Sequence, residues 1–403
     1  MTGPFLADTL VLDFTRVLAG PFCTMTLADL GARVIKVESL EGDEARGMGP
    51  FANGHSLYFA SINRGKESVT LNLKHPDGVD IARRLASRAD VVVENYRPGT
   101  LERLGLGYEA VKERNGGVVY LSLSGFGQVG PYRDRGAYDV IIQAMSGLMG
   151  ITGPAGGSPT RVGASLGDLV PALYATVAVL AALRHRERAG EGCHLDIAMM
   201  DAAVAVVENA LARYWVSGED PGPIGNRHPA IAPFSTFGTA DGQIVIACGN
   251  DTLWRRLCVA IDRPQLAEDP RFVTNADRSA HAEDLACVLE QTLTEHETGH
   301  WMEILLAAGI PCAKVNRMSD LMADPHLHAR DMIVEMDHPD IGRFPVPGSP
   351  IKVSGHRSKL GRPAPGLGAQ TRSVLVEVLK LSPADLLRLE RAGAIGGTNA
   401  SAT

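Results

Sequence analysis

The stretch TLVLDFTRVLAGPFCTMTLADLGARVIKVE, residues 9–38, carries the pattern that decides the fold. Two short runs rich in Val, Leu and Ile, Thr9–Phe14 and Arg33–Glu38, have the length and composition of buried β-strands. The segment Pro21–Leu30 between them has a helical pattern. A helix between two apolar strands is typical of a parallel βαβ unit. We therefore expect a parallel sheet that begins near the N-terminus.

The same alternation of strand and helix patterns continues through the first half of the chain. Further strands are expected at Ser68–Leu73, Asp90–Asn95 and Val118–Ser124, with helices at Pro76–Ala89 and Tyr108–Asn115 between them. Beyond these we expect helices at about Tyr138–Met149 and Leu169–Arg188, a strand at His194–Ala198 and a long helix at Met199–Val216. The pattern predicts an α/β protein with a parallel sheet.

A segment rich in Gly and Pro, Ser217–Pro233, marks a change in this organisation. Phe234–Gly238 and Gln243–Cys248 follow it and predict a β-hairpin. We expect helices next at Asp251–Ile261, Ala276–His296 and Gly299–Ala308, then Pro- and Gly-punctuated strands from Met332 and two final helices, Thr371–Leu381 and Ala384–Ala392. The part beyond Ser217–Pro233 has the size of a second, smaller α+β domain of about a hundred residues.

Composition and charge restrict the classes of function. The chain of 403 residues is 45% hydrophobic and 21% charged, with a formal net charge of -7 that argues against a nucleic-acid partner. Its six cysteines form no C-x-x-C pair and no zinc-site spacing. The N-terminus lacks a signal-peptide pattern, and we see no apolar segment of membrane-spanning length. We therefore expect a cytoplasmic, soluble protein without a metal or a membrane partner.

Two motifs suggest ligands that their context disfavours. Gly125, Gly127 and Gly130 form a G-x-G-x-x-G pattern after a predicted strand, as in NAD-binding oxidoreductases. However, Pro131 and the polar residues after it delay the helix that should meet the pyrophosphate. His326 and His328 are two residues apart, so they diverge on a helix and suit a metal poorly.

Asp168 closes the segment GASLGD, directly before the apolar, helix-patterned run Leu169–Leu183. Aspartate is a favoured N-cap, so capping is one interpretation. The other is a nucleophilic carboxylate, since the positive end of a helix favours the ionised form. Arg97 and Arg103 follow a predicted parallel strand, where open α/β sheets bind ligands, but they are equally compatible with a solvated surface.

Several ordered segments together resemble the class III CoA-transferase family, which also contains α-methylacyl-CoA racemases. The resemblance covers nearly the whole chain. Its segments are VLDFTRVLAGP (11–21), LGARVIKVE (30–38), GDEARG (42–47), NRGKESVTLNLK (63–74), DVVVENYRPG (90–99), SLSGFGQVGPYRDRGAYD (122–139), GASLGD (163–168) and GNRHPAIAPF (225–234).

The resemblance implies a Rossmann-like large domain built from residues 1–217 and 332–403, with a small α+β domain, 218–331, inserted between them. It also implies a homodimer of two chains threaded through each other as interlocked rings. CoA enters as a substrate, with no tightly bound cofactor. The break placed at Ser217 from composition agrees with the implied insertion.

The resemblance also assigns site residues. Asp168 matches the family's nucleophile, and Arg97 and Arg103 would face CoA phosphates, which guanidinium groups bind well. The positions that match the CoA site are Val17, Leu18, Ala19, Ser39, Leu71, Asn72, Leu73, Lys74, Asn95, Tyr96, Arg97, Arg103, Ala137, Tyr138 and Asp139. In the implied reaction Asp168 attacks an acyl-CoA and passes through a mixed anhydride and an aspartyl-CoA thioester before a carboxylic acid takes the CoA.

The racemase alternative requires a proton-transfer pair. Its histidine position is Tyr138 here, and neutral tyrosine is a weak base near pH 7, so we favour the transferase. Met48, Leu18 and the loop GNRHPAIAP differ from the oxalate-using formyl-CoA transferases. The loop resembles members that take succinyl-CoA and C4 to C6 dicarboxylates. Arg46, Arg227 and His228 are our candidates for binding the distal carboxylate.

Overall fold

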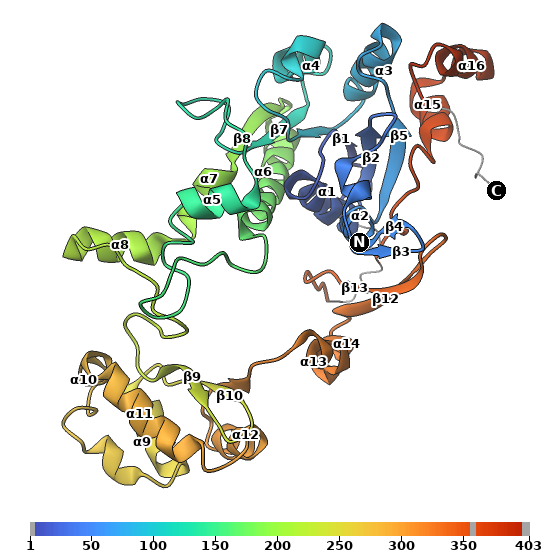
Figure 1. The fold of residues 1–403 in the computed structure, drawn as a ribbon. Coiled ribbons are helices and arrows are strands. Elements are labelled where there is room, and N and C mark those ends of the chain that lie inside the picture. Colours follow the sequence, from blue (N-terminus) through green and yellow to red (C-terminus); the bar gives the residue numbers. More distant parts are fainter. Residues whose placement is uncertain (1–4, 355–359, 397–403) are drawn as a thin grey trace. The chain divides into compact units, whose positions relative to one another are not determined.

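The computed structural model describes residues 5–354 and 360–396 as a mixed α/β protein (Figure 1). Internal contacts group the chain into two compact units. The first contains the residues up to Leu148, Val162–Leu211 and the chain from His326 onward. The second contains Met149–Arg161 and Ala212–Pro325. Met149–Arg161, which we expected within the first domain, is thus grouped with the second unit.

The first unit is built on a six-stranded sheet with the order β5-β2-β1-β6-β7-β8, in which every neighbouring pair is parallel. The parallel sheet predicted from residues 9–38 is therefore confirmed. Renumbered by sequence, the order is 3-2-1-4-5-6, that of doubly wound nucleotide-binding sheets. The strands are β1 (Leu10–Asp13), β2 (Arg33–Glu38), β5 (Lys66–Thr70), β6 (Val91–Glu94), β7 (Val119–Ser124) and β8 (Cys193–Ala198).

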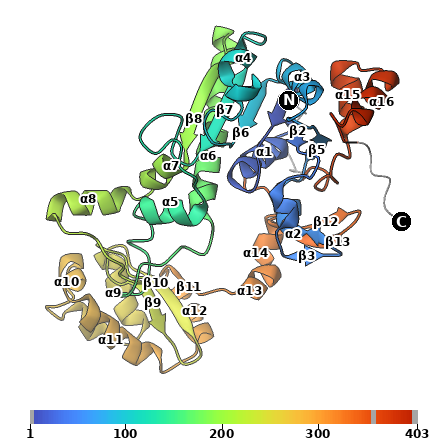
Figure 2. The same ribbon diagram turned by 45° about the horizontal axis from the view of Figure 1, so that its top comes forward.

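Helices cover both faces of the sheet because successive strand residues point to opposite sides. Val11 belongs to one buried cluster with residues of α1 (Ala19–Asp29) and α6 (Leu166–Ala189). Its neighbour Leu12 belongs to the other, with residues of α3 (Pro76–Ala86), α15 (Thr371–Leu379) and α16 (Pro383–Arg391). The C-terminal helices thus pack beside β5, near the start of the chain (Figures 1 and 2).

The remaining elements of the first unit are short. They are α2 (Leu57–Ile62), α4 (Tyr108–Lys112), α5 (Asp139–Met145), α7 (Met199–Ala205), the ribbon of β3 (Phe51–Ala52) and β4 (His55–Ser56), and the ribbon of β12 (Ile333–His338) and β13 (Gly342–Pro347). Two helices cross the boundary between the units, α8 (Glu208–Ser217) and α14 (Pro325–Ala329). The single long helix expected at Met199–Val216 is wrong, since α7 ends before α8 begins.

Helix α6 corrects a second expectation. It has 24 residues, a window with a mean hydropathy of 1.8, and is thus long and apolar enough to cross a membrane by length and composition alone. We had seen no segment of this kind in the sequence. One such helix is weak support for a membrane span, and α6 packs against α1, α7, β7 and β8.

The second unit has an antiparallel sheet with the order β11-β10-β9. The hairpin predicted from the sequence is confirmed as β9 and β10. Trp254, Phe272, Leu289 and Trp301 are buried in its core. The elements are β9 (Phe234–Gly238), β10 (Gln243–Ala247), α9 (Asp251–Ala260), α10 (Asn275–Ala280), α11 (Ala282–Leu293), α12 (Thr298–Ala307), β11 (Cys312–Lys314) and α13 (Met318–Ala323). The helix expected at Ala276–His296 is therefore two helices.

Candidate active site

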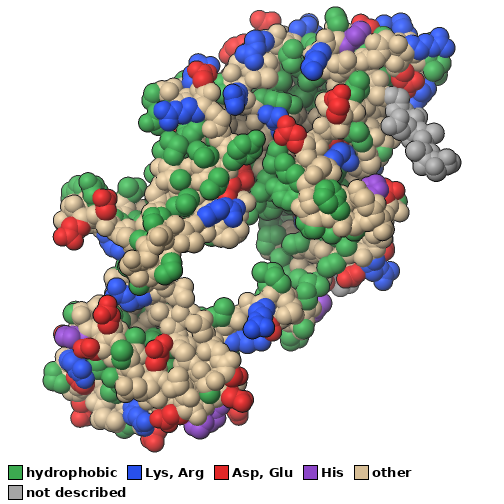
Figure 3. All heavy atoms as spheres, viewed as in Figure 1, with side chains coloured by type: hydrophobic (Ala, Val, Ile, Leu, Met, Phe, Trp, Pro, Cys, Tyr) green, Lys and Arg blue, Asp and Glu red, His purple; other side chains and the backbone are tan. Residues whose placement is uncertain are grey.

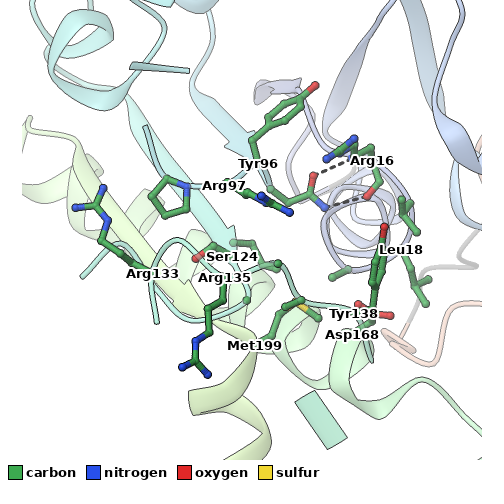
Figure 4. A pocket seen from close by; sticks show the side chains of 18 of the residues that line it. Arg16, Leu18, Tyr96, Arg97, Ser124, Arg133, Arg135, Tyr138, Asp168 and Met199 are labelled. Carbon is green, nitrogen blue, oxygen red and sulfur yellow. Dashed lines mark hydrogen bonds between the residues drawn. The ribbon is translucent and has the colours of Figure 1, made fainter. Parts of the chain in front are cut away.

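A cavity of about 150 Å³ lies at the carboxyl ends of β1, β6, β7 and β8. The segments that follow these strands supply its walls, together with the loop 133–138 and the first turn of α6 (Figure 4). The sheet order reverses between β1 and β6, which is where open α/β sheets bind ligands. The volume is below the roughly 300–1,000 Å³ of typical ligand pockets, so it suits the reacting end of a larger, partly exposed ligand.

The wall after β1 is held by hydrogen bonds to the wall after β6. The backbone N–H of Arg16 donates to Asn95 Oδ1 at 2.9 Å, and Asn95 Nδ2 donates to the Arg16 carbonyl at 2.9 Å (Figure 4). The Arg16 guanidinium pairs with Glu44 at 2.7 Å and lies over the Tyr96 ring. These contacts fix two strand-end loops against each other.

Cationic side chains dominate the lining. Arg16, Arg97, Arg133 and Arg135 line the cavity, and the acidic lining residues are Glu44 and Asp168. The cavity therefore suits an anionic ligand although the chain as a whole is acidic. In Figure 4, Asp168 lies with Tyr138 and Leu18 on one side of the view, and Arg133 and Arg135 lie on the other.

Asp168 is in the first turn of α6, not at its N-cap. The helix begins at Leu166, and the N-cap residue is Ser165. The interpretation of Asp168 as the N-cap residue is therefore wrong. The helix terminus still contributes a positive partial charge near the Asp168 carboxylate, which favours the ionised form.

Asp139 lies behind the cavity wall and is buried. Its Oδ1 accepts a hydrogen bond from the backbone N–H of Gly167 at 2.8 Å, and Gln143 Nε2 donates to the same carboxylate at 2.9 Å. A Cβ on Gly167 would approach the Asp139 carbonyl oxygen to 2.8 Å, so only glycine fits between them. Asp139 thus holds the backbone directly before Asp168, and its expected place in the CoA site stays a prediction.

The structure brings together nine of the residues expected at the site. Val17, Leu18, Ala19, Asn95, Tyr96, Arg97, Ala137, Tyr138 and Asp168 line the cavity. Ser39 follows β2 and Leu71–Lys74 follow β5, so both lie along the same edge of the sheet but outside the lining. Arg103 is exposed beside Thr100 and also lies outside it.

Arg46 does not line this cavity, and its expected role at the distal carboxylate stays a prediction. Its guanidinium donates to both carboxylate oxygens of Glu38 at 2.7 Å and to the Pro365 carbonyl at 3.1 Å, and it stacks on the Phe59 ring. A guanidinium engaged in this way is a structural link between strand β2 and the C-terminal part of the chain.

Arg227 and His228 belong to the second unit. Arg227 is exposed. His228 is partly buried, its Nδ1 accepts the backbone N–H of Ala230 at 3.1 Å, and its ring lies beside Phe234. Their proposed contact with an acid substrate stays a prediction.

Sequence reasoning missed several residues at or near the cavity. Arg16, Arg133 and Arg135 line it, and their position just after strands or in the 122–139 segment was the available signal. Tyr58 was missed as well. Burial and the negative charges of Asp168, Asp43 and Asp139 raise the pKa of Tyr58 to about 12, so its phenol is a neutral hydrogen-bond donor near Asp168.

No group of three or more His, Cys, Asp and Glu side chains arranged to hold a metal ion occurs within residues 5–354 and 360–396. The G-x-G-x-x-G segment is followed by a helix only at Asp139, so the delay of this helix that Pro131 predicts is confirmed. A Cβ on Gly125 would approach the Ala137 Cβ to 2.3 Å, so this glycine instead lets the 133–138 loop close against β7.

Comparisons with known proteins agree with this geometry. Residues 6–371 match the sequence pattern of CoA-transferase family III. The chain is similar to acetyl-CoA:oxalate CoA-transferase of Acetobacter aceti, with 44% identity over 91% of this chain and 94% of that protein. It is also similar to succinyl-CoA:glutarate CoA-transferase of Homo sapiens, with 38% identity over 96% of this chain and 88% of that protein.

A solved structure shows the same fold. The crystal structure of a CAIB/BAIF family protein from Brucella suis superimposes with a TM-score of 0.83 at 37% identity, and the match covers 93% of this chain and 99% of that chain. The family pattern spans most of the sequence, and the relatives are aligned over nearly their full length. The chain therefore belongs to CoA-transferase family III.

Proposed function

We propose that the protein moves CoA from an acyl-CoA, with succinyl-CoA as the leading candidate, to a free dicarboxylic acid, and that Asp168 is the nucleophile. The observation that carries this proposal is the position of Asp168. It shares a cavity with four arginines at the point where the sheet order reverses, in the first turn of a long helix. The class of the enzyme, a CoA-transferase, follows from the family.

The reaction can be written with the residues present. An Asp168 carboxylate oxygen attacks the thioester carbonyl, the C–S bond breaks, and CoA leaves as a thiolate with a mixed anhydride on the enzyme. The thiolate then attacks the aspartyl carbonyl and releases the donor acid, which leaves an aspartyl-CoA thioester. The acceptor carboxylate repeats these steps in reverse order. No proton, oxidant or ATP is consumed, and the arginines around the cavity stabilise the anionic groups.

The choice of acid is supported by the relatives' names. One relative is named for glutarate and the other for oxalate, and both acids are dicarboxylates. Oxalate, which we disfavoured because of Met48, Leu18 and the loop GNRHPAIAP, returns to the candidates, because the oxalate-named relative is 44% identical.

The proposal extends to the assembly and its location. We propose a Rossmann-like domain from residues 1–217 and 332–403, an inserted domain from 218–331, and a cytoplasmic homodimer of interlocked chains. The strand order supports the first point. Exposed apolar side chains on α6, Leu173, Tyr174 and Val177, support a protein partner, and hydrophobic side chains are also visible on the surface of α8 (Figure 3).

The test is to incubate the protein with succinyl-CoA and each of glutarate, oxalate, mesaconate and butyrate, and to identify new CoA thioesters by mass. We expect transfer without ATP, and better with dicarboxylates than with butyrate. Thioesters formed only with ATP would reject the transferase mechanism. Epimerisation of a 2-methylacyl-CoA without an acceptor acid would indicate that the protein is a racemase. Tight binding of NADH without binding of CoA would favour the alternative hypothesis of an NAD-binding oxidoreductase.

A further inference from the structure

The sheet of the first unit buries charged side chains that the transfer chemistry does not use. Asp13, Lys36 and Lys66 are each 0% exposed, and Asp43 is 7% exposed. Lys66 Nζ lies 3.0 Å from Asp13, and Lys36 Nζ lies 2.8 Å from Asp43. Buried charges are costly to desolvate, and replacing buried pairs by apolar residues is often neutral or stabilising, so overall stability alone is a weak reason for them.

The backbone of the cavity wall that contacts these charges is strained. Val17 has a φ of +65°, in the left-handed region. This conformation is a genuine outlier for a β-branched residue, and it persists only where surrounding contacts enforce it. Leu18 and Ala19, the next two residues, line the cavity, and the Leu18 side chain packs in a cluster that includes Leu169, the neighbour of Asp168.

The Lys36–Asp43 pair supplies contacts to the backbone before Val17 and at Val17 itself. Lys36 Nζ donates to the Thr15 carbonyl at 2.7 Å. Asp43 Oδ1 accepts the backbone N–H of Val17 at 3.1 Å and that of Ala45 at 2.9 Å. The ion pair therefore holds the backbone at Thr15, three residues before Leu18, and at Val17, one residue before it.

The pair is ionised in its buried site. Burial lowers the pKa of Lys36, but the charges of Asp13, Asp43 and Glu38 outweigh burial and raise it above its ordinary value. Burial likewise raises the pKa of Asp43, and Lys36 outweighs it and lowers that pKa. Each member keeps the other charged, so the loss of either weakens the remaining contact with the loop.

We propose that Lys36 and Asp43 are a positioning pair for CoA transfer, which holds Val17 in the left-handed conformation and thereby fixes Leu18 and Ala19 in the cavity wall beside Asp168. The pair touches no reacting atom. Its effect is on the geometry of the wall, so it should act on kcat more than on folding. This inference rests on the proposed transfer reaction in this cavity.

The test is a double-mutant cycle between D43A and V17G. Glycine adopts the left-handed conformation without the steric cost of valine, so a chain with glycine at this position depends less on Asp43. We expect D43A alone to lower kcat by about tenfold, because that is the effect expected when one strained backbone residue relaxes. In the V17G background the loss caused by D43A should shrink to about threefold or less.

Two further variants separate positioning from stability. D29N breaks the Arg64–Asp29 pair, which is also buried in the first unit, at 2.6 Å, but lies outside the cavity lining. It should lower the melting temperature and leave kcat unchanged where the protein is folded. If D43A does not fold, K36M/D43A removes both charges and the acceptor for the Val17 N–H while keeping the charge balance, and the same cycle with V17G applies.

A kcat loss that is equal in the Val17 and V17G backgrounds would overturn the inference, as would a folded D43A or K36M/D43A protein with unchanged kcat. Wild-type protein and D168A are measured alongside. Absence of transfer by the wild type would reject the proposed function itself, whereas transfer by the wild type but not by D168A, together with an unaffected pair variant, would reject only the positioning role.

Discussion

The two units bury charge in different ways. The first buries Asp13, Lys36 and Lys66 in its sheet, where Lys36 contacts the backbone that leads into the cavity wall. In the second, Arg278 is the one charged residue that is buried among the described residues, in a core that is otherwise mainly apolar. Arg278 donates to the carbonyls of Ala232 and Phe272, which ties loops to a helix. Buried charge in the first unit thus holds the backbone of a cavity wall, whereas in the second unit it links loops to a helix of the core.

The largest effect is expected for D168A, which tests whether the first unit carries the chemistry. Removal of a covalent nucleophile should lower kcat by at least about a thousandfold. Asp168 is not the N-cap of α6, so its loss should cost at most about 1 kcal/mol of stability. Transfer is measured with the preferred acid pair, and stability is measured by thermal unfolding. Surviving activity in a destabilised protein would show that Asp168 is structural.

The second prediction addresses the apolar core of the second unit. Leu289 is fully buried there, so L289A should reduce the free energy of unfolding by about 2–5 kcal/mol. Denaturant titration measures this loss. At a temperature where the variant is folded, kcat should match the wild type. A tenfold fall in kcat would mean that this core also supports the chemistry, and the contrast between the units would fail.

The third prediction concerns Glu94, a buried acid at the end of β6 beside the cavity loop. Burial raises its pKa to about 7, despite hydrogen bonds from Ser122 and from the backbone of Tyr96, and the charges of Glu102 and Asp196 raise it further. The unfolded-state pKa is about 4.3, so the folded state binds the proton more tightly. The resulting stability is complete below about pH 4 and is lost as the pH rises through about 7.

The variant E94Q removes this dependence because glutamine does not ionise. Between pH 5 and pH 8 the free energy of unfolding should fall more in the wild type than in E94Q, by up to about 3 kcal/mol. Denaturant titrations at both pH values measure the difference. Parallel pH profiles for the two proteins would show that Glu94 has an ordinary pKa.

The smallest expected effect is on the choice of acid. If Arg227 binds the distal carboxylate, R227M should lower the preference for succinate over butyrate by about tenfold and spare turnover with butyrate. R46M is the matched control. Arg46 is held by Glu38 and the Pro365 carbonyl, so its loss should reduce stability and leave the preference unchanged. An unchanged preference in R227M would leave the choice to the shape of the site.

The sequence predicted the elements that depend on local pattern. The strand Arg33–Glu38 has the predicted bounds, because a run of apolar residues is buried wherever the sheet forms. Arg97 lines the cavity, in keeping with its place after a predicted parallel strand, and Asp168 was singled out at the start of a helix pattern, whereas Asn95 and Tyr96 were expected only from the family resemblance. These features need no knowledge of distant contacts.

The failures involve long-range contacts. Nothing near Arg46 in the sequence indicates that its guanidinium donates a hydrogen bond to the carbonyl of Pro365, 319 residues later. The hydrogen bond between Asp139 and Gly167, 28 residues away, likewise cannot be seen in a pattern. The left-handed backbone of Val17 was missed for the same reason, since local propensity disfavours it and only tertiary contacts hold it.

The three tryptophans of the chain, Trp215, Trp254 and Trp301, all lie in the second unit. Trp254 and Trp301 are buried in its core, and Trp215 is 85% exposed. Intrinsic tryptophan fluorescence therefore records the unfolding of this unit, whereas circular dichroism records the helices and strands of both. Denaturation curves from the two signals coincide only if the units unfold together, so an unlabelled sample already carries a separate optical reporter for the smaller unit.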